Sequence, residues 1–360
     1  ISLLHPGVNV LAIHGLNVLD TDADFLILPE LVASSNLGLP HYMLSPTPGA
    51  DNLPGALGFV DDTEFSVNRG FYDTPQQVAI TTDSSGATIV YTLDGTKPTT
   101  SHGIAYTAPI DISSTTTLRA FAYKPGYEPT NVDTHTYIFV QDVVSQDYQA
   151  TLDAGLPTTW NGTSVDYGMD PDVIGTFDAN GNPIGGDIYG GQYASTIQND
   201  LLDIPTLSIV MNVDDMFGVN GIYSHPTLGG VAWERETSVE LMYPDGSEGF
   251  QVDAGIRIQG GWFRQAGVKK HSLRLLFKDD YGPSKLNYEW FGADADDSYD
   301  SITLRAGAND GYAWDAARYT EQYVRDEFGR SLQRAAGGMA SHGDFVHLYI
   351  NGIYWGLYNP

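Results

Sequence analysis

Apolar and polar residues alternate in short runs along most of the chain, a pattern that predicts β-strands rather than long helices. The runs are rich in Val, Ile, Thr and Tyr, and clusters of Gly, Pro, Asn, Asp and Ser separate them. Such clusters form turns. With 40 Gly and 19 Pro among 360 residues, the sequence predicts a multi-domain, mainly β protein.

The first 60 residues predict the end of one domain and a linker. Two strands, Val8–His14 and Phe25–Leu31, are expected within residues 1–35 on either side of a turn. Two strands are too few to build a core of their own. We therefore interpret residues 1–35 as the closing part of a β-sandwich domain. Between residues 36 and 60 the periodicity disappears and Pro, Gly, Ser and Asn become frequent, which indicates a linker.

Residues 61–140 predict a small β-sandwich. The alternation and the turn signals predict four strands: Gln77–Thr82, Thr88–Thr92, Thr117–Tyr123 and Asp133–Phe139. Asp94-Gly95 predicts a tight turn, and Leu118, Ala120 and Ala122 alternate so that they share one face of a strand. Four tyrosines could stack on sugar rings, although tyrosine in a small sandwich is more often a core residue: Tyr91, Tyr106, Tyr123 and Tyr127.

Residues 141–204 form a connector that is rich in Asp, Gly and Asn and shows little periodicity. Its length exceeds that of a plain loop, so it is either an extended wrap or a functional insert. Asp178, Asn180 and Asn182 alternate like the oxygen ligands of a calcium loop. Pro183 and Tyr189 stand where an EF-hand loop needs Gly and Glu. An Asn-Gly hairpin turn is therefore the preferred interpretation, and calcium is the alternative.

Residues 205–360 predict a sheet followed by a helix and a hairpin. Pro205–Met211, Thr237–Tyr243 and Gln251–Gln259 predict antiparallel strands, and Ser272–Phe277 predicts another. Asn351-Gly352 predicts a two-residue turn between the strands Phe345–Ile350 and Tyr354–Tyr358. A helix is expected over Tyr312–Ala336, ending at Gly337-Gly338. Its apolar residues would share one buried face: Ala316, Tyr319, Tyr323, Phe328 and Leu332.

Charge and composition narrow the choice of partner. The chain carries 45 Asp and Glu against 17 Lys and Arg, a formal charge of -28, so it repels nucleic acid and anionic membranes. Cysteine is absent, which excludes disulfides and thiol chemistry. No apolar run approaches the 18 or so residues of a membrane span. Because the sequence begins at Ile1 and ends at Pro360 beside expected strands, we expect both ends to be cuts in a longer protein.

Three stretches carry resemblances to known modules. "GVNVLAIHGLN…DADFLILPEL" resembles the closing strands of a galactose-binding-like jelly roll. "IVYTLDGTKPTTSHGIAYTAPIDISSTTTLRAFAYKPGYEPT" resembles the immunoglobulin-like module named for the chitobiase/β-hexosaminidase C-terminus, covering about residues 61–140. "GIRIQGG…KKHSLRLLFK", "LRAGANDGYAW", "YVRDEFGRSLQRAAG" and "HGDFVHLYINGIYWGLYN" occur in the order seen in CotH kinase proteins. This last resemblance, over residues 205–360, implies an α+β lobe like the N-lobe of an atypical kinase, cut before its C-lobe.

The CotH resemblance implies an ATP-dependent protein kinase that uses Mg-ATP. It places Lys270 at the nucleotide phosphates, with Lys269 as the fallback, Glu327 as an ion-pair partner and Arg257 as a further candidate. The catalytic and metal-binding aspartates would follow Pro360. Residues 1–360 alone are therefore expected to be inactive and not to bind Mg-ATP, which is expected of the full-length family domain. A solvated basic loop is the alternative interpretation of Lys269 and Lys270.

Two classes of function therefore remain open from the sequence. One is a secreted or cell-surface bacterial kinase that phosphorylates surface proteins. The other is a structural or adhesive surface protein, without catalysis, that contacts polysaccharide. A glycoside hydrolase is a third idea, but no pair of catalytic carboxylates is identifiable, and no glycan-binding residue can be assigned.

Overall fold

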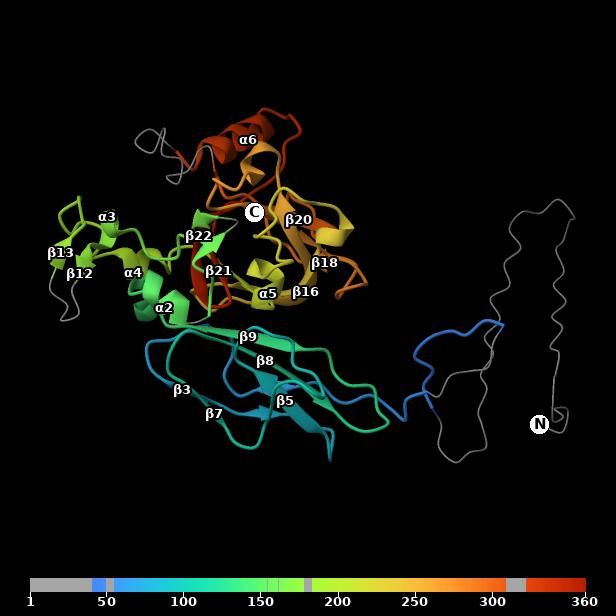
Figure 1. Ribbon diagram of the computed structural model, residues 1–360. Coiled ribbons are helices and arrows are strands. Elements are labelled where there is room, and N and C mark those ends of the chain that lie inside the picture. Colours follow the sequence, from blue (N-terminus) through green and yellow to red (C-terminus); the bar gives the residue numbers. More distant parts are fainter. Residues whose placement is uncertain (1–40, 50–54, 154, 161, 178–182, 309–321) are drawn as a thin grey trace, which may run out of the picture. The chain divides into compact units, whose positions relative to one another are not determined.

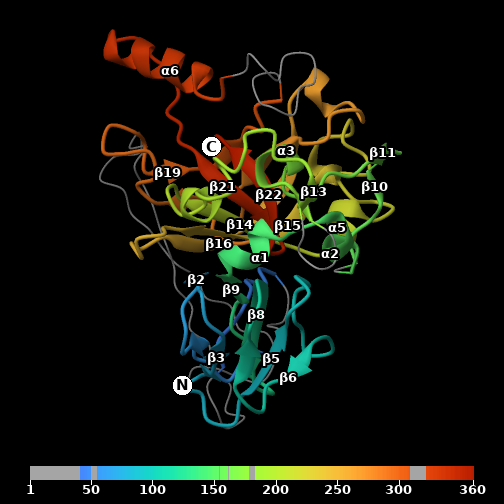
Figure 2. The same cartoon turned by 90° about the vertical axis from the view of Figure 1, so that its left-hand side faces the viewer.

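The computed structural model describes residues 41–49, 55–153, 155–160, 162–177, 183–308 and 322–360, as shown in Figures 1 and 2. The chain divides into two compact units, residues 1–58 and 59–360. The predicted jelly-roll strands at 1–35 lie outside the described residues, as do the calcium candidates Asp178, Asn180 and Asn182. In residues 41–58 the backbones of Tyr42 and Ala56 pair in an isolated antiparallel bridge. In the second unit, residues 59–139 form an immunoglobulin-like sandwich.

Short strands build the sandwich, and the main predicted strands are present within one residue of their expected ends. Among the described residues, one five-stranded sheet has the order β2-β9-β8-β5-β6, while β1 pairs with β4 and β3 with β7. The strands are β1 Glu64–Phe65, β2 Gly70–Phe71, β3 Gln76–Val78, β4 Ile80–Thr81, β5 Thr88–Thr92, β6 Ile104–Ala105, β7 Ile110–Ile112, β8 Thr116–Tyr123 and β9 Asp133–Ile138. The predicted strand at 77–82 is thus divided between β3 and β4.

Strand β8 is buried on both faces. Leu118, Ala120 and Ala122 face the sandwich core, as their alternation predicts, and are fully buried. Arg119 points the other way, yet it is also buried. Its guanidinium donates a hydrogen bond to the backbone carbonyl of Gly95, 3.1 Å away, in the Asp94-Gly95 turn. The second face of this sheet is therefore covered by protein as well.

The connector consists of short elements packed on the rest of the unit. They are α1 Val140–Val144, α2 Tyr148–Asp153, β10 Thr159–Trp160, β11 Thr163–Ser164, α3 Pro171–Ile174, β12 Thr176–Phe177, β13 Pro183–Gly185 and α4 Ile197–Asp200. Strands β12 and β13 pair antiparallel on either side of residues 178–182. Val143 and Leu201 pack with Ile138 of β9, and Trp160 is buried in the core of the following domain. The connector therefore follows the protein surface and contributes to its core.

Residues 205–360 form a mixed sheet. Among the described residues it has seven strands in the order β20-β17-β16-β15-β14-β21-β22. The elements of this region are β14 Thr206–Val210, α5 Val213–Phe217, η1 Val231–Trp233, β15 Arg235–Met242, β16 Phe250–Gln259, η2 Trp262–Arg264, β17 Ser272–Leu276, β18 Leu286–Asn287, β19 Ser298–Tyr299, β20 Ser301–Leu304, α6 Arg325–Ala335, β21 Val346–Ile350 and β22 Ile353–Tyr358. Neighbouring strands are antiparallel as predicted, except β14 and β21, which are parallel. Figure 1 shows this sheet beside the sandwich, with β9 on the facing side.

The sheet curls until its two edge strands meet. Arg305, just after β20, and Asn359, just after β22, exchange two backbone hydrogen bonds of 2.9 Å each. The apolar faces of the strands enclose one core, to which the connector adds Trp160 and Tyr167. This curvature brings residues of β17 and β22 close together although four strands lie between them in the sheet order.

The hairpin between β21 and β22 has the predicted turn. Asn351 and Gly352 have φ angles of +49° and +79°, the left-handed conformation that a type I′ turn requires at both positions. The Asn351 side chain accepts a hydrogen bond from the Met211 backbone N–H and donates one to the Met211 carbonyl, both 2.8 Å. The turn is thereby fixed to the end of β14.

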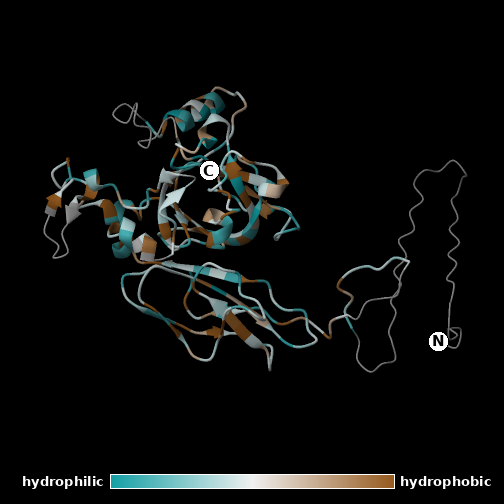
Figure 3. Ribbon diagram, in the orientation of Figure 1, coloured by the Kyte–Doolittle hydropathy of each residue, from teal (hydrophilic) through white to brown (hydrophobic). Residues whose placement is uncertain are grey.

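The helix prediction is wrong in its packing. The described helix α6 covers only Arg325–Ala335, while residues 309–321, with Ala316 and Tyr319, lie outside the described residues. Phe328 and Leu332, expected in the core, are 69% and 60% exposed. The charged face packs inward instead, because Asp326 pairs with Arg305 and Arg330 donates to Asn359 Oδ1. Figure 3 shows hydrophilic positions along much of α6. The predicted end at Gly337, which has φ +80°, is confirmed.

A buried polar contact joins the sandwich to the curled sheet. Glu240 of β15 is fully buried and accepts hydrogen bonds from the backbone N–H (3.0 Å) and the hydroxyl of Thr136 of β9. The Thr136 hydroxyl also lies 2.8 Å from the Ser208 hydroxyl of β14, and Arg69 lies 3.6 Å from Glu240. Burial raises the pKa of Glu240. Specific hydrogen bonds therefore hold the two domains together.

Candidate functional site

The side chain of Lys270 lies just before β17, against Trp355 of β22. Its ammonium is 4.1 Å from the centre of the Trp355 ring and 5.6 Å from that of Trp160. It donates one hydrogen bond, of 2.7 Å, to the backbone carbonyl of Asp166. An ammonium has three N–H donors, so two of them have no acceptor within the described part of the chain. The group is attracted to the aromatic faces and can still donate to an incoming ligand.

Five aromatic rings surround this position. The Trp160 ring lies 5.2 Å from each of three rings, those of Tyr167, Tyr223 and Trp355, and it stacks on Phe217 at 6.1 Å. The connector supplies Trp160 and Tyr167, while α5, the loop after it and β22 supply the others. The cluster comes from segments nearly 200 residues apart, so only the tertiary structure assembles it.

The connector is fixed to the loop that carries Lys270. Thr163 of β11 donates a 2.8 Å hydrogen bond to the backbone carbonyl of Ala266, and Lys269 lies 3.8 Å from the Asp166 carboxylate. Both of these side chains are near the surface. Together with the Lys270–Asp166 contact, they hold Thr163 and Asp166 of the connector next to the loop that carries the lysine.

Burial lowers the pKa of the Lys270 ammonium to about 8, although the nearby Asp166 carboxylate opposes the shift. Desolvation disfavours the charged form of a lysine. At neutral pH most of the molecules still carry the charge. Within the described part of the chain, no carboxylate is in direct contact with this cation, so an anionic ligand would stabilise it.

The other sequence candidates lie in different surroundings. Arg257 pairs with the buried Glu234 at 3.2 Å, and Lys278 reaches the same carboxylate at 2.6 Å. Glu327 pairs with Arg330 at 2.7 Å and with Arg334 at 3.1 Å within α6. The predicted Lys270–Glu327 ion pair is not formed. The carboxylate is held on its own helix, because the helix presents its charged face to Asn359 and Arg305.

The sequence reasoning missed Trp160, Trp355 and Asp166. Trp355 lies within one of the motifs that carry the CotH resemblance, whereas Trp160 and Asp166 lie in the connector, where the only signal was the high aromatic content of 12%. In the described ranges, no group of three or more His, Cys, Asp or Glu side chains is placed to hold a metal ion. We therefore assign no residue to magnesium or calcium. The helices within those ranges are all too short or too polar to cross a membrane.

Comparison with known families agrees with the two resemblances in the second unit. Residues 67–134 match the family model described as the chitobiase/beta-hexosaminidase C-terminal domain, which corresponds to the sandwich. Residues 256–360 match the model described as CotH kinase protein, and this segment includes Lys270 and Trp355. No curated protein and no solved structure matches the chain. The chain thus carries a chitobiase/beta-hexosaminidase C-terminal domain followed by a CotH kinase protein segment.

Proposed function

We propose that the chain supplies the nucleotide-binding lobe of an ATP-dependent protein kinase of the CotH kind, and that Lys270 contacts the nucleotide phosphates. The observation that carries this proposal concerns Lys270, which lies within the CotH-matched segment. Among the described residues its ammonium has one hydrogen-bond acceptor, which leaves two of its three donors for a ligand. Phosphoryl transfer relies on cations placed against the phosphates. ATP supplies the transferable phosphoryl group when bound, and Lys270 would hold and orient its oxygens.

The position of the connector limits how a phosphate group can approach Lys270. The Asp166 carbonyl uses one donor of Lys270, and Trp160 covers one side of the ammonium. A phosphate oxygen therefore has to approach the remaining donors, or else displace Asp166. Lys269 lies close to the side-chain carboxylate of Asp166 and is the next cation that a phosphate group would meet.

Titration calorimetry of the 360-residue chain with Mg-ATP tests the proposal. Although the sequence alone predicts no Mg-ATP binding by residues 1–360, the position of Lys270 in the structure leads us to expect binding. We expect Lys270→Met to weaken it by at least tenfold, about 1.4 kcal/mol. Lys285→Met is the matched control, because Lys285 forms an exposed ion pair with Asp300 and its loss should leave the affinity unchanged. Equal affinities of wild type and Lys270→Met, with both proteins folded by circular dichroism, would show that Lys270 has no part in binding.

A non-catalytic surface role is the second candidate. Arg257, Lys269 and Glu327 form ion pairs with other side chains of the chain. Three of the four residues predicted to bind the nucleotide therefore already have partners, which favours the non-catalytic role. Complete absence of Mg-ATP binding by the wild-type chain would favour this role over the kinase.

We propose further that the protein acts outside the cell, on proteins or polysaccharide at a bacterial surface. The match of residues 67–134 to the chitobiase/beta-hexosaminidase C-terminal domain supports this placement. Fractionation of the source cells, followed by antibody detection, tests it. Recovery of the protein only from the cytoplasm would contradict the placement without affecting the nucleotide proposal.

A further inference from the structure

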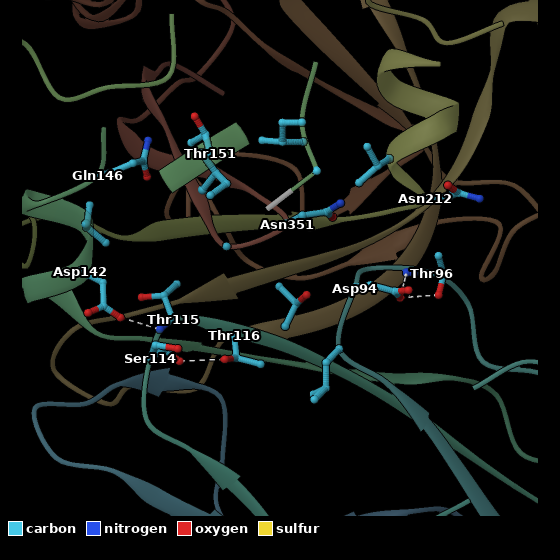
Figure 4. Close-up of a pocket in the computed structure, with 18 of the residues that line it drawn as sticks. Asp94, Thr96, Ser114, Thr115, Thr116, Asp142, Gln146, Thr151, Asn212 and Asn351 are labelled. Atoms are coloured by element: carbon cyan, nitrogen blue, oxygen red, sulfur yellow. Dashed lines mark hydrogen bonds between the residues drawn. The ribbon is translucent and has the colours of Figure 1, made fainter. Parts of the chain in front are cut away.

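A cleft of about 790 Å³ lies where the sandwich, the connector and the curled sheet meet. Figure 4 shows side chains from all three parts around it. The sandwich contributes the loop at 93–96 and residues 114–117 at the start of β8, the connector contributes α1, α2 and the residues after α2, and the sheet region contributes the start of α5 and the β21–β22 turn. This volume falls in the range of small-molecule sites. The cleft is separate from the Lys270 position, because neither Lys270 nor Trp355 lines it.

The cleft walls offer mainly hydrogen-bond acceptors. Thr116 donates its hydroxyl proton to the Ser114 carbonyl at 2.8 Å. Ser145 likewise donates to the Asp142 carbonyl at 3.0 Å. Because these protons are used inside the protein, the hydroxyl lone pairs remain for a ligand. A ligand rich in donors fits such walls.

Three carboxylates add negative charge, and the described residues that line the cleft include no basic side chain. Asp142 uses one oxygen to accept from the Thr115 N–H at 2.7 Å. Although partial burial opposes it, hydrogen bonds from Thr96 hold the pKa of Asp94 below its usual value. Asp214, the third, lies at the start of α5 and is exposed. Phosphates and acidic sugars would be repelled, whereas protonated amines would be attracted.

The cleft is held open by close packing below it. A Cβ atom on Gly95 would lie 2.8 Å from Asn351, and one on Gly352 would lie 3.3 Å from Thr115. Both glycines have a φ of +79°. The Asp94-Gly95 turn of the sandwich thus packs on the Asn351-Gly352 turn of the sheet. Since these turns cannot move apart without losing the junction, the walls are arranged before any ligand binds.

A second hollow, of about 490 Å³, continues the cleft along the sandwich. It shares Leu93 and Asp94 with the first, and adds Tyr91, His102 and Ile104. Leu93 and Ile104 are exposed apolar side chains, which suit the C–H faces of sugar rings. The two hollows give room for an extended ligand with alternating polar and apolar surface.

We propose that this cleft binds a polyhydroxylated amine, in particular an amino-sugar oligomer. Hydroxyl and ammonium donors of the ligand would meet the threonine and serine lone pairs and the carboxylates of Asp94, Asp142 and Asp214. The site is independent of the nucleotide proposal, because it uses other residues and a ligand of opposite charge.

The test is titration calorimetry of the 360-residue chain at mildly acidic pH with a glucosamine tetramer. Oligomers of glucose, galacturonate and lysine serve as comparisons. We expect the glucosamine tetramer to bind best and the galacturonate oligomer not to bind. Asp142→Asn and Asp214→Asn should each weaken binding by fivefold or more. Asp245→Asn removes an exposed carboxylate outside the cleft, with the same change of net charge, and should have no effect.

Several outcomes would overturn the proposal. The first is the absence of glucosamine binding by a folded wild-type chain. The second is an equal loss of affinity in Asp245→Asn, which would indicate attraction by the net charge alone. The third is equally tight, Asp214-dependent binding of the lysine oligomer, which would show that the cleft recognises charge without recognising hydroxyl groups.

Discussion

The ammonium of Lys270 lies over the face of Trp355, 4.1 Å from the ring centre, although β17 and β22 stand at nearly opposite ends of the sheet order. They meet because the sheet curls until Arg305 and Asn359 pair. Tyr358 of β22 reaches the same loop, donating a 3.0 Å hydrogen bond to the His271 carbonyl. The position of the Lys270 ammonium therefore depends on the closure of the sheet as well as on the loop that carries it.

The affinity for Mg-ATP should fall as the pH rises through about 8, where Lys270 loses its proton. A group with this pKa is roughly 90% charged at pH 7 and about 10% charged at pH 9, so we expect a drop of about tenfold over that interval. Calorimetry at several pH values measures it. Lys270→Arg should keep its affinity across the range, because arginine stays charged. A wild-type affinity independent of pH would argue against contact with Lys270.

Replacing Trp160 by Ala should lower the free energy of unfolding by about 3–5 kcal/mol, the usual cost of removing a buried aromatic side chain. Trp160 is 4% exposed and contacts several rings at once. The matched control is Trp262→Ala, at a position 62% exposed, which should cost about 1 kcal/mol or less. Urea unfolding distinguishes the two. Similar losses in both variants would mean that the connector does not belong to the core.

Glu240→Ala should lower the free energy of unfolding by about 3–5 kcal/mol, because it leaves the Thr136 N–H and Arg69 without their buried partner. Glu236, on the same strand, forms a partly exposed ion pair with Lys97, so Glu236→Ala should cost about 1 kcal/mol or less. Urea unfolding curves of the two variants provide the comparison. Equal costs would show that the Thr136–Glu240 contact does not stabilise the junction.

Asp253 should make the protein more stable in mild acid than at neutral pH. Burial raises the pKa of its carboxyl group from 3.8 to about 6, although Arg119 and Lys97 oppose the shift. The folded state therefore binds this proton more tightly than the unfolded state. The resulting stability is fully present below about pH 3.8 and is lost as the pH rises through about 6. A shift of this size corresponds to about 2–3 kcal/mol.

The comparison of wild type with Asp253→Asn isolates this effect, since both proteins share every other titrating group. The stability of the variant relative to wild type should increase as the pH rises from about 4 to 7, which urea unfolding at each pH measures. Asp279→Asn, which removes the same charge at an exposed position, is the matched control. A constant difference for Asp253→Asn would refute the assignment.

Most strands could be predicted from the sequence because alternation and turn chemistry are local properties. The ends of β5, β14, β16 and β17 lie within one residue of the prediction. The Asn351-Gly352 turn was also predictable, since few residue pairs adopt two left-handed conformations in succession. The sequence motifs around Lys270 and Asn351 also predicted the CotH match. A family motif is a local pattern of residues, so it can be recognised without the tertiary structure.

The sequence by itself therefore determined the strands, the turns and the two family segments, all of which depend on neighbouring residues. Only the tertiary structure decided which faces are covered. Ser208 and Glu240 are polar residues within strands and yet are buried, because the sandwich packs on that face. Phe328 is apolar and yet exposed, because α6 turns its charged side towards Arg305 and Asn359. Periodicity identifies two faces of an element, but the partner that covers each face comes from residues distant in the chain.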